Sequence, residues 1–242
     1  MMRRLGFTLA GAAGLVAALA SGHAHAVLTC TAANTITVGN NGTVADSALG
    51  AGVCVSAADK LYGNFNFGNL PTAGNDVRFS WTAPIGGFHT ESFEGTLNPL
   101  TSYTGFGFEI AINDGTHGVG AFPGAAGSSI TMLTGDFDET NPGAANSTLT
   151  KNTTPTGTPA AGIVCTRPGG STVCPQSITY SPGQTDLVVT ESLTTGANFV
   201  GASIINTVQQ ATPSIPEPAS LALLGSALAG FGLLIRRRRK TS

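Results

Sequence analysis

Apolar and polar residues alternate along two segments near the middle of the chain. Across residues 76–82, Val77, Phe79 and Trp81 fall on one face of an extended chain, and residues 106–112 repeat the pattern. A period of two is typical of a strand that buries one face. The pattern predicts β-strands at both places, with Trp81 packed in the core rather than displayed for binding.

Further strands are indicated on both sides of these segments. Phe65 and Phe67 share one face, and residues 198–209 have the pattern of a final strand. Two strand-like runs, 177–180 and 185–192, flank a Ser-Pro-Gly-Gln turn, which predicts a hairpin. No stretch between the two ends of the chain has a long helical period. The predicted fold is therefore mainly β, an antiparallel β-sandwich or jelly-roll.

Two segments have the composition of loops. Residues 118–129 are rich in Gly and Ala, and residues 141–162 are rich in Thr, Pro, Gly and Asn. Such compositions disfavour regular elements. We predict that both are loose, with residues 141–162 forming a long loop or a disordered segment.

The beginning of the chain predicts a secretory signal helix over residues 1–26. Arg3 and Arg4 precede an apolar stretch, and Ala24 and Ala26 form an A-x-A cleavage site. These are the parts that signal peptidase recognises, so the mature chain is expected to begin at Val27. Residues 27–212 would then be an exported, β-rich domain.

The end of the chain, residues 213–242, predicts a membrane-embedded tail. Residues 219–235 carry no charge, and as a helix they would span roughly 25 Å, the short end of what crosses a bilayer core. Basic residues beside a span remain on the cytoplasmic side. The pattern predicts a single transmembrane helix in the inner membrane, with the body outside and a cytoplasmic anchor of Arg236, Arg237, Arg238, Arg239 and Lys240.

The order of parts in this tail resembles the PEP-CTERM sorting signal. Pro216, Glu217 and Pro218 come first, followed by a Gly- and Ala-rich apolar span and an arginine-rich basic cluster that ends two residues before the end of the chain. The resemblance implies that an exosortase, a membrane-embedded cysteine transpeptidase-like enzyme, recognises Pro216–Glu217–Pro218. Such enzymes occur in Gram-negative bacteria that make exopolysaccharide. It further implies cutting near this motif and delivery to the cell surface or extracellular matrix.

Charge is distributed unevenly between the tail and the body. The body has twelve acidic residues and four basic ones, a net charge of −8, although the whole chain carries only −2. An acidic body with isolated cations binds nucleic acid poorly. The four basic residues are Lys60, Arg78, Lys151 and Arg167.

All four cysteines lie in the part predicted to be exported. An even number in an oxidising compartment indicates two disulfides rather than a metal site. Pairing of Cys30 with Cys54 and of Cys165 with Cys174 is the simplest of three connectivities.

No known catalytic motif occurs in the body, and no catalytic residue is assigned. His89 with Glu91 and Glu94 could form a metal or acid–base cluster, but solvated strand or loop positions are the commoner reading. A glycosidase needs two suitably spaced carboxylates. The nominal candidates are Glu91, Glu94, Glu109 and Asp138.

A short acidic run is the one candidate for a cofactor. Asp136, Asp138 and Glu139 supply the oxygen ligands that calcium prefers, although the EF-hand pattern is not met. An acidic, solvated turn is the alternative interpretation, so no cofactor beyond a low-affinity calcium ion is expected.

Taken together, the sequence predicts a non-enzymatic surface or matrix protein that is sorted through its tail and associates with exopolysaccharide or biofilm. A carbohydrate-binding module is the first alternative, and a secreted hydrolase the second.

Overall fold

The computed structural model describes residues 28–97, 102–139, 147–167, 174, 177–196 and 201–212. The predicted signal peptide, its cleavage site and the whole tail lie outside these residues. Within them, no helix has both the length and the apolar character needed to cross a membrane.

Thirteen strands and a single 3-10 turn, Asp46–Ala48, make up the regular structure of the described residues. The strands are β1 (Thr35–Val38), β2 (Gly42–Ala45), β3 (Cys54–Ala57), β4 (Lys60–Asn66), β5 (Asp76–Trp81), β6 (Phe88–Leu97), β7 (Tyr103–Ile112), β8 (Ser129–Glu139), β9 (Ser147–Thr154), β10 (Ile163–Arg167), β11 (Ile178–Gln184), β12 (Asp186–Thr194) and β13 (Gly201–Ala211).

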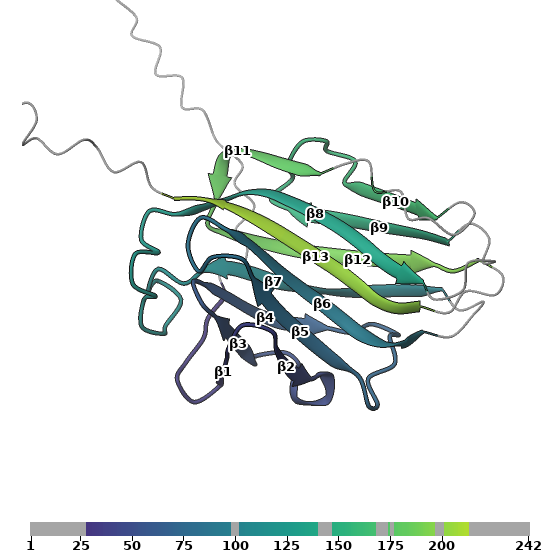
Figure 1. The fold of residues 1–242 in the computed structure, drawn as a ribbon, viewed down its shortest axis with the longest axis horizontal. Coiled ribbons are helices and arrows are strands. Elements are labelled where there is room, and N and C mark those ends of the chain that lie inside the picture. The colour runs from purple at the N-terminus through teal and green to yellow at the C-terminus, as the bar shows by residue number, and fades with distance from the viewer. Residues whose placement is uncertain are drawn as a thin grey trace, which may run out of the picture.

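The strands form two stacked sheets, which confirms the predicted β fold (Figure 1). One sheet has seven strands in the order β1-β3-β4-β7-β12-β9-β10, and the other has six in the order β11-β8-β13-β6-β5-β2. All pairings are antiparallel except that of β1 with β3. The chain crosses between the sheets repeatedly, so each sheet combines strands from distant parts of the sequence.

The predicted strands are present, but the predicted hairpin is wrong. β11 and β12 are separated only by Thr185, yet β11 pairs with β8 in one sheet while β12 pairs with β7 and β9 in the other. The Ser181–Gln184 segment lies inside β11 and introduces a break in its register with β8. The chain turns a corner between the layers here instead of folding back on itself.

The prediction of a loose segment at 141–162 also needs correction. Its middle forms β9, which lies between β12 and β10 in the seven-stranded sheet. Threonine is abundant in β9, and β-branched residues favour strands. Alternate side chains of β9, at Leu149, Lys151 and Thr153, are buried, so tertiary packing outweighs the loop-like composition.

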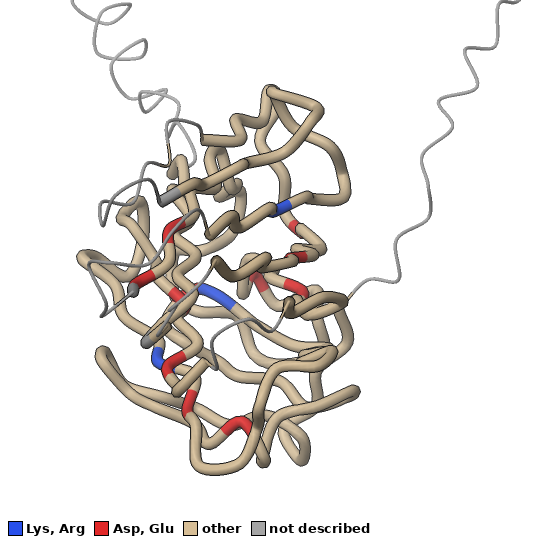
Figure 2. The backbone as a smooth tube through the Cα atoms, turned by 90° about the vertical axis from the view of Figure 1, so that its right-hand side faces the viewer, with Lys and Arg blue, Asp and Glu red and all other residues tan. Residues whose placement is uncertain are grey.

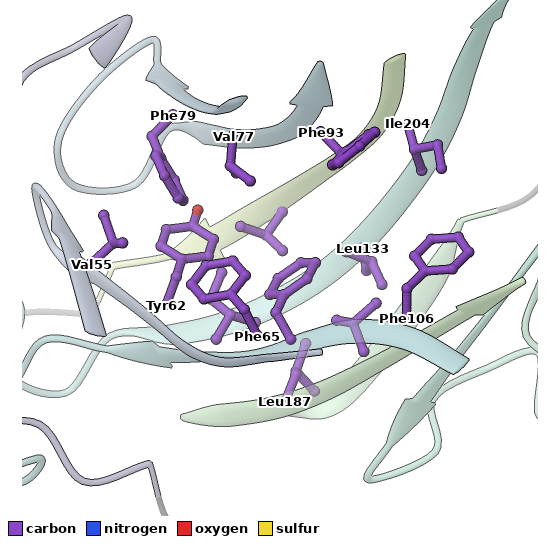
Figure 3. Packing of buried hydrophobic residues seen from close by; sticks show 14 of the residues in the cluster. Val55, Tyr62, Phe65, Val77, Phe79, Phe93, Phe106, Leu133, Leu187 and Ile204 are labelled. Carbon is purple, nitrogen blue, oxygen red and sulfur yellow. The ribbon is translucent and has the colours of Figure 1, made fainter. Parts of the chain in front are cut away.

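Aromatic and aliphatic side chains together fill the space between the sheets (Figure 3). Tyr62 and Phe65 of the seven-stranded sheet face Phe79 of the other, with a Tyr62–Phe79 ring-centroid distance of 4.9 Å. Edge and tilted contacts of this kind add about 0.5–1.5 kcal/mol per pair beyond area burial. Trp81 packs against the same core, as its strand pattern predicts.

A smaller core lies on the outer face of the seven-stranded sheet. Leu28 and Cys30 of the N-terminal segment cover Leu61 and Ala111 there, and Cys30 is bonded to Cys54 of β3. His117 reinforces the contact, since its backbone oxygen accepts from Cys30 N at 2.7 Å and its Nδ1 lies 2.8 Å from Leu28 O. The start of the domain is thereby fastened to the sheet.

The second disulfide joins Cys165 of β10 to Cys174. Both bonds therefore match the local pairing that was the simplest expectation from sequence. No free cysteine remains in the described residues.

The two disulfides should differ in their contribution to stability. Cys30 and Cys54 are 24 residues apart, whereas Cys165 and Cys174 are 9 apart. Because cross-links that close longer loops restrict the unfolded chain more, Cys30→Ser with Cys54→Ser should lower the free energy of unfolding by about 1 kcal/mol more than Cys165→Ser with Cys174→Ser. Denaturant unfolding of the two double variants measures this difference. An equal or reversed order would contradict the prediction.

Candidate functional site

Two of the four basic side chains of the body are buried in its interior. Lys60 and Lys151 are both 0% exposed. Arg78, by contrast, lies on the surface with its Nε 2.7 Å from Glu94 Oε1. Figure 2 shows how sparse basic positions are along the backbone, and how acidic positions outnumber them. Burying a charge is costly unless it is paired. The surroundings of the two buried lysines are therefore the candidate functional sites.

Lys151 lies between the sheets in a network of four polar side chains. In the seven-stranded sheet, Lys151 of β9 stands directly opposite Glu191 of β12. In the six-stranded sheet, Asn206 of β13 stands directly opposite Glu91 of β6. All four side chains are buried. Two cross-strand pairs therefore meet in the middle of the sandwich.

The Lys151 ammonium group has three acceptors. It donates to Glu191 Oε1, to Asn206 Oδ1 at 2.8 Å and to the backbone oxygen of Ile205 at 2.9 Å. A lysine ammonium group has three protons to donate. Its hydrogen-bonding capacity is therefore filled without water.

Asn206 connects the lysine to both carboxyl groups. Its Nδ2 lies 3.0 Å from Glu91 Oε2 and 3.3 Å from Glu191 Oε2. The carboxamide thus has the lysine at its oxygen and a carboxyl group on each side of its nitrogen. This arrangement fixes the orientation of Asn206.

A glycine makes room for the lysine. Gly135 of β8 is the cross-strand neighbour of Asn206. A Cβ added at Gly135 would overlap Cε and Cδ of Lys151. The absence of a side chain at this position lets the lysine stem reach Asn206 in the opposite sheet.

Burial keeps Glu91 protonated near neutral pH. Desolvation and, to a smaller extent, the nearby Glu191 charge raise the pKa of Glu91 to about 8, against the opposing effects of Asn206 and Lys151. The network therefore holds one carboxyl group that can donate a proton and a second that binds the lysine.

A small pocket adjoins this network. Its cavity volume of about 20 Å³ is enough for about one water molecule. A sugar ring does not fit in this volume. The pocket is lined by Phe65, Asn66, Phe67, Leu70, Glu91, Phe93, Phe106, Gly107, Phe108 and Glu191.

Lys60 belongs to a second buried cluster. Its Nζ donates to Gln210 Oε1 and lies 3.0 Å from Asp59 Oδ1, which is 2.9 Å from His89 Nε2. The ring of His89 stacks on Trp81 with centroids 5.9 Å apart. The tight β3–β4 turn, in which Ala58 has a φ of 52°, leads directly into Asp59.

The charges of this second cluster compensate one another. Burial raises the pKa of Asp59, but the His89 and Lys60 contacts outweigh it and leave the pKa below its ordinary value. Burial lowers the pKa of Lys60 to about 8, against the opposing charge of Asp59. Gln210 Nε2 has no hydrogen-bond partner among the described residues.

The sequence candidates for chemistry do not assemble into one site. His89 and Glu91 are buried, which corrects the expectation of solvated positions, but each belongs to a different cluster. Glu94 lies on the opposite face of β6 with Arg78. Glu109 is half-buried on β7, and Asp138 is exposed on β8.

The calcium candidates occupy a strand rather than a turn. Asp136 and Asp138 are exposed on the outer face of β8, with the buried Phe137 between them. The side chain of Glu139 lies outside the described part of the chain. No group of three or more metal-ligating side chains is gathered in that part.

The residues that matter most in both clusters were missed from the sequence. Glu191, Asn206 and Gln210 lie in phase with buried apolar residues of β12 and β13, and Lys60 lies in phase with Tyr62 of β4. Lys151 differs, because Leu149 is the one apolar residue in phase with it in β9. With only four basic residues in the body, a lysine at a position in phase with an apolar residue of a strand is unusual. Such a position would have indicated a buried polar cluster. Recognising it requires the register of β9, whose composition resembles a loop.

The predicted sorting and cleavage residues lie outside the described part of the chain. The comparisons with known proteins do address the tail. Residues 214–239 match the PEP-CTERM protein-sorting motif. No curated protein and no solved structure matches the chain. The tail therefore carries a PEP-CTERM sorting motif, which supports a PEP-CTERM domain-containing protein that is targeted to the surface by an exosortase.

The raised pKa of Glu91 predicts a pH-dependent stability. Between its ordinary value of 4.5 and about 8, the folded state holds a proton that the unfolded state releases. Stability from this group is therefore lost as the pH rises through this window, by up to about 1.4 kcal/mol per pH unit. Glu91→Gln should flatten the pH profile of the unfolding free energy, measured in denaturant from pH 5 to 8.

The matched control is Glu94→Gln, on the outer face of the same strand, which should keep the wild-type slope. An unchanged slope in Glu91→Gln would show that Glu91 ionises normally in the fold.

Proposed function

We propose that this chain is an exported, non-enzymatic structural protein of the extracellular matrix, anchored by its tail until an exosortase processes it. The carrying observation is the PEP-CTERM motif at residues 214–239. Two disulfides in the body fit an oxidising compartment outside the cytoplasm.

The tail provides a physical basis for processing. Pro216 and Pro218 restrict the backbone and disfavour helix just before the apolar residues 219–235. An extended segment at the membrane face is the shape that a processing enzyme can bind. Arg236–Lys240 would hold the C-terminus in the cytoplasm, which presents Pro216–Pro218 on the outer side of the inner membrane.

The buried aromatic rings of the body support a scaffold role. Its tyrosines, Tyr62, Tyr103 and Tyr180, are all buried, and Phe88 is the large exposed aromatic ring of the described residues. A carbohydrate-binding module presents several exposed rings on a sheet. The scaffold role is therefore favoured over that alternative.

The hydrolase alternative has less support. Glu91 and Glu191 line the pocket described above, but it holds about one water molecule. Both carboxyl groups also accept hydrogen bonds from Asn206 and are enclosed between the sheets. They are placed to act on neighbouring side chains rather than on a substrate from solution.

Processing through the motif can be tested in the producing bacterium. The triple variant Pro216→Ala, Glu217→Ala, Pro218→Ala should accumulate as full-length protein in the inner membrane, because the enzyme no longer recognises it. Thr212→Ala, just before the matched residues, should be processed like the wild type. Immunoblots of membrane and extracellular fractions report both outcomes. Normal release of the triple variant would overturn the proposed route.

Association with exopolysaccharide needs a separate measurement. The mature protein should migrate more slowly in native gels that contain the bacterium's own exopolysaccharide than in gels without it. The reduced and denatured protein serves as control and should show no such difference. Equal migration of the native protein in both gels would contradict a matrix role through polysaccharide.

A further inference from the structure

We propose that Lys151 and Asn206 form an intramolecular amide bond that covalently joins the two sheets. The bond would link Nζ of Lys151 to Cγ of Asn206. It would tie β9 of the seven-stranded sheet to β13 of the six-stranded one. This inference concerns the folded body and does not rest on the proposed function.

The reacting atoms are already in contact. Lys151 Nζ lies 2.8 Å from Asn206 Oδ1, and a C=O bond is about 1.2 Å long, so the amine lies within about 4 Å of the carboxamide carbon. Each residue lies on a strand that is paired within its own sheet, and Gly135 leaves room for the lysine stem. Held in this way, an amine and a carbonyl react with a large advantage over the same groups in solution.

Glu191 is placed to activate the nucleophile. Only the neutral amine attacks a carbonyl, and Glu191 Oε1 accepts a hydrogen bond from the Lys151 ammonium group. Transfer of that proton to Glu191 produces the neutral amine inside an apolar enclosure. Such an enclosure favours neutral forms over charged ones.

Glu91 is placed to assist the leaving group. Its Oε2 lies 3.0 Å from Asn206 Nδ2, and burial raises the pKa of Glu91 to about 8. The protonated carboxyl group can therefore give a proton to the nitrogen that must depart. The two carboxyl groups take opposite roles because only one of them binds the lysine.

The reaction balances without any other reactant. Lys151 gives one proton to Glu191, and its amine attacks Cγ of Asn206 to form the new C–N bond. Glu91 protonates Nδ2, the Cγ–Nδ2 bond breaks, and ammonia leaves. The attacking nitrogen returns a second proton to Glu91, and the ammonia takes up the proton held by Glu191 as it departs. No electrons are gained or lost.

The second buried lysine provides an internal comparison. Lys60 also donates to a carboxamide, that of Gln210. Gln210 Nε2, however, has no hydrogen-bond partner among the described residues, and the adjacent Asp59 has a lowered pKa, so it holds no proton to donate. We therefore expect the amide bond at Lys151 and none at Lys60.

Mass spectrometry of the reduced, denatured full chain tests the proposal. The protein should be lighter by one ammonia than the mass calculated for the residues that it contains. Proteolytic peptides that contain Lys151 and Asn206 should be recovered as one linked species, and trypsin should fail to cleave after Lys151. A mass equal to that calculated mass, with separate peptides at these positions, would overturn the proposal. So would linkage at Lys60 in place of Lys151.

Variants test the assigned roles. Glu191→Gln should reduce the linked fraction at least about tenfold, because it removes the general base, whereas Glu94→Gln should leave it unchanged. Asn206→Asp should still link, now releasing water, and its product should have the same mass as the linked wild type. Full linkage in Glu191→Gln, or a linked mass in Lys151→Arg, would contradict the mechanism.

Discussion

The ammonium group of Lys151 is the constraint on which the centre of this fold depends. An unpaired charge between the sheets would cost several kcal/mol, so the ammonium group needs hydrogen-bond acceptors. These acceptors come from both layers. Glu191 reaches it from one sheet and Asn206 from the other, and Glu91 completes the bonding of Asn206. These contacts are directional, unlike the surrounding aromatic packing. They therefore require a particular alignment of β9 and β12 against β13 and β6.

Strand identity was more accessible from the sequence than strand partnership. The alternation of Val77, Phe79 and Trp81 predicts β5 because one face of that strand is buried. β9 was missed because its threonines resemble a loop, and its buried side chains include Lys151. The supposed hairpin at 177–192 failed for a different reason. A short connection can turn back or cross between layers, and local composition does not distinguish the two outcomes.

The site was still harder to predict than the fold. Glu91 and Glu191 are one hundred residues apart, and only the pairing of β13 with β6 and of β12 with β9 brings them to the same carboxamide. The tail presents the opposite case. Its signal is read from contiguous residues, so the sequence identified the PEP-CTERM motif that the comparison also finds at residues 214–239. A motif of contiguous residues can be identified from the sequence alone, whereas a network of residues from distant strands cannot.

The position of β13 has a mechanical consequence. This strand is flanked on both sides, by β8 and by β6, and it ends at Ala211, with two residues between it and the sorting motif at residues 214–239. Any tension applied to the tail enters the body along an interior strand. The hydrogen bonds of its two ladders run across that direction, so they are loaded together in shear instead of opening one at a time. A tail attached to an edge strand would load the hydrogen bonds to a single neighbour, whereas a tail attached to β13 loads the hydrogen bonds to both β8 and β6.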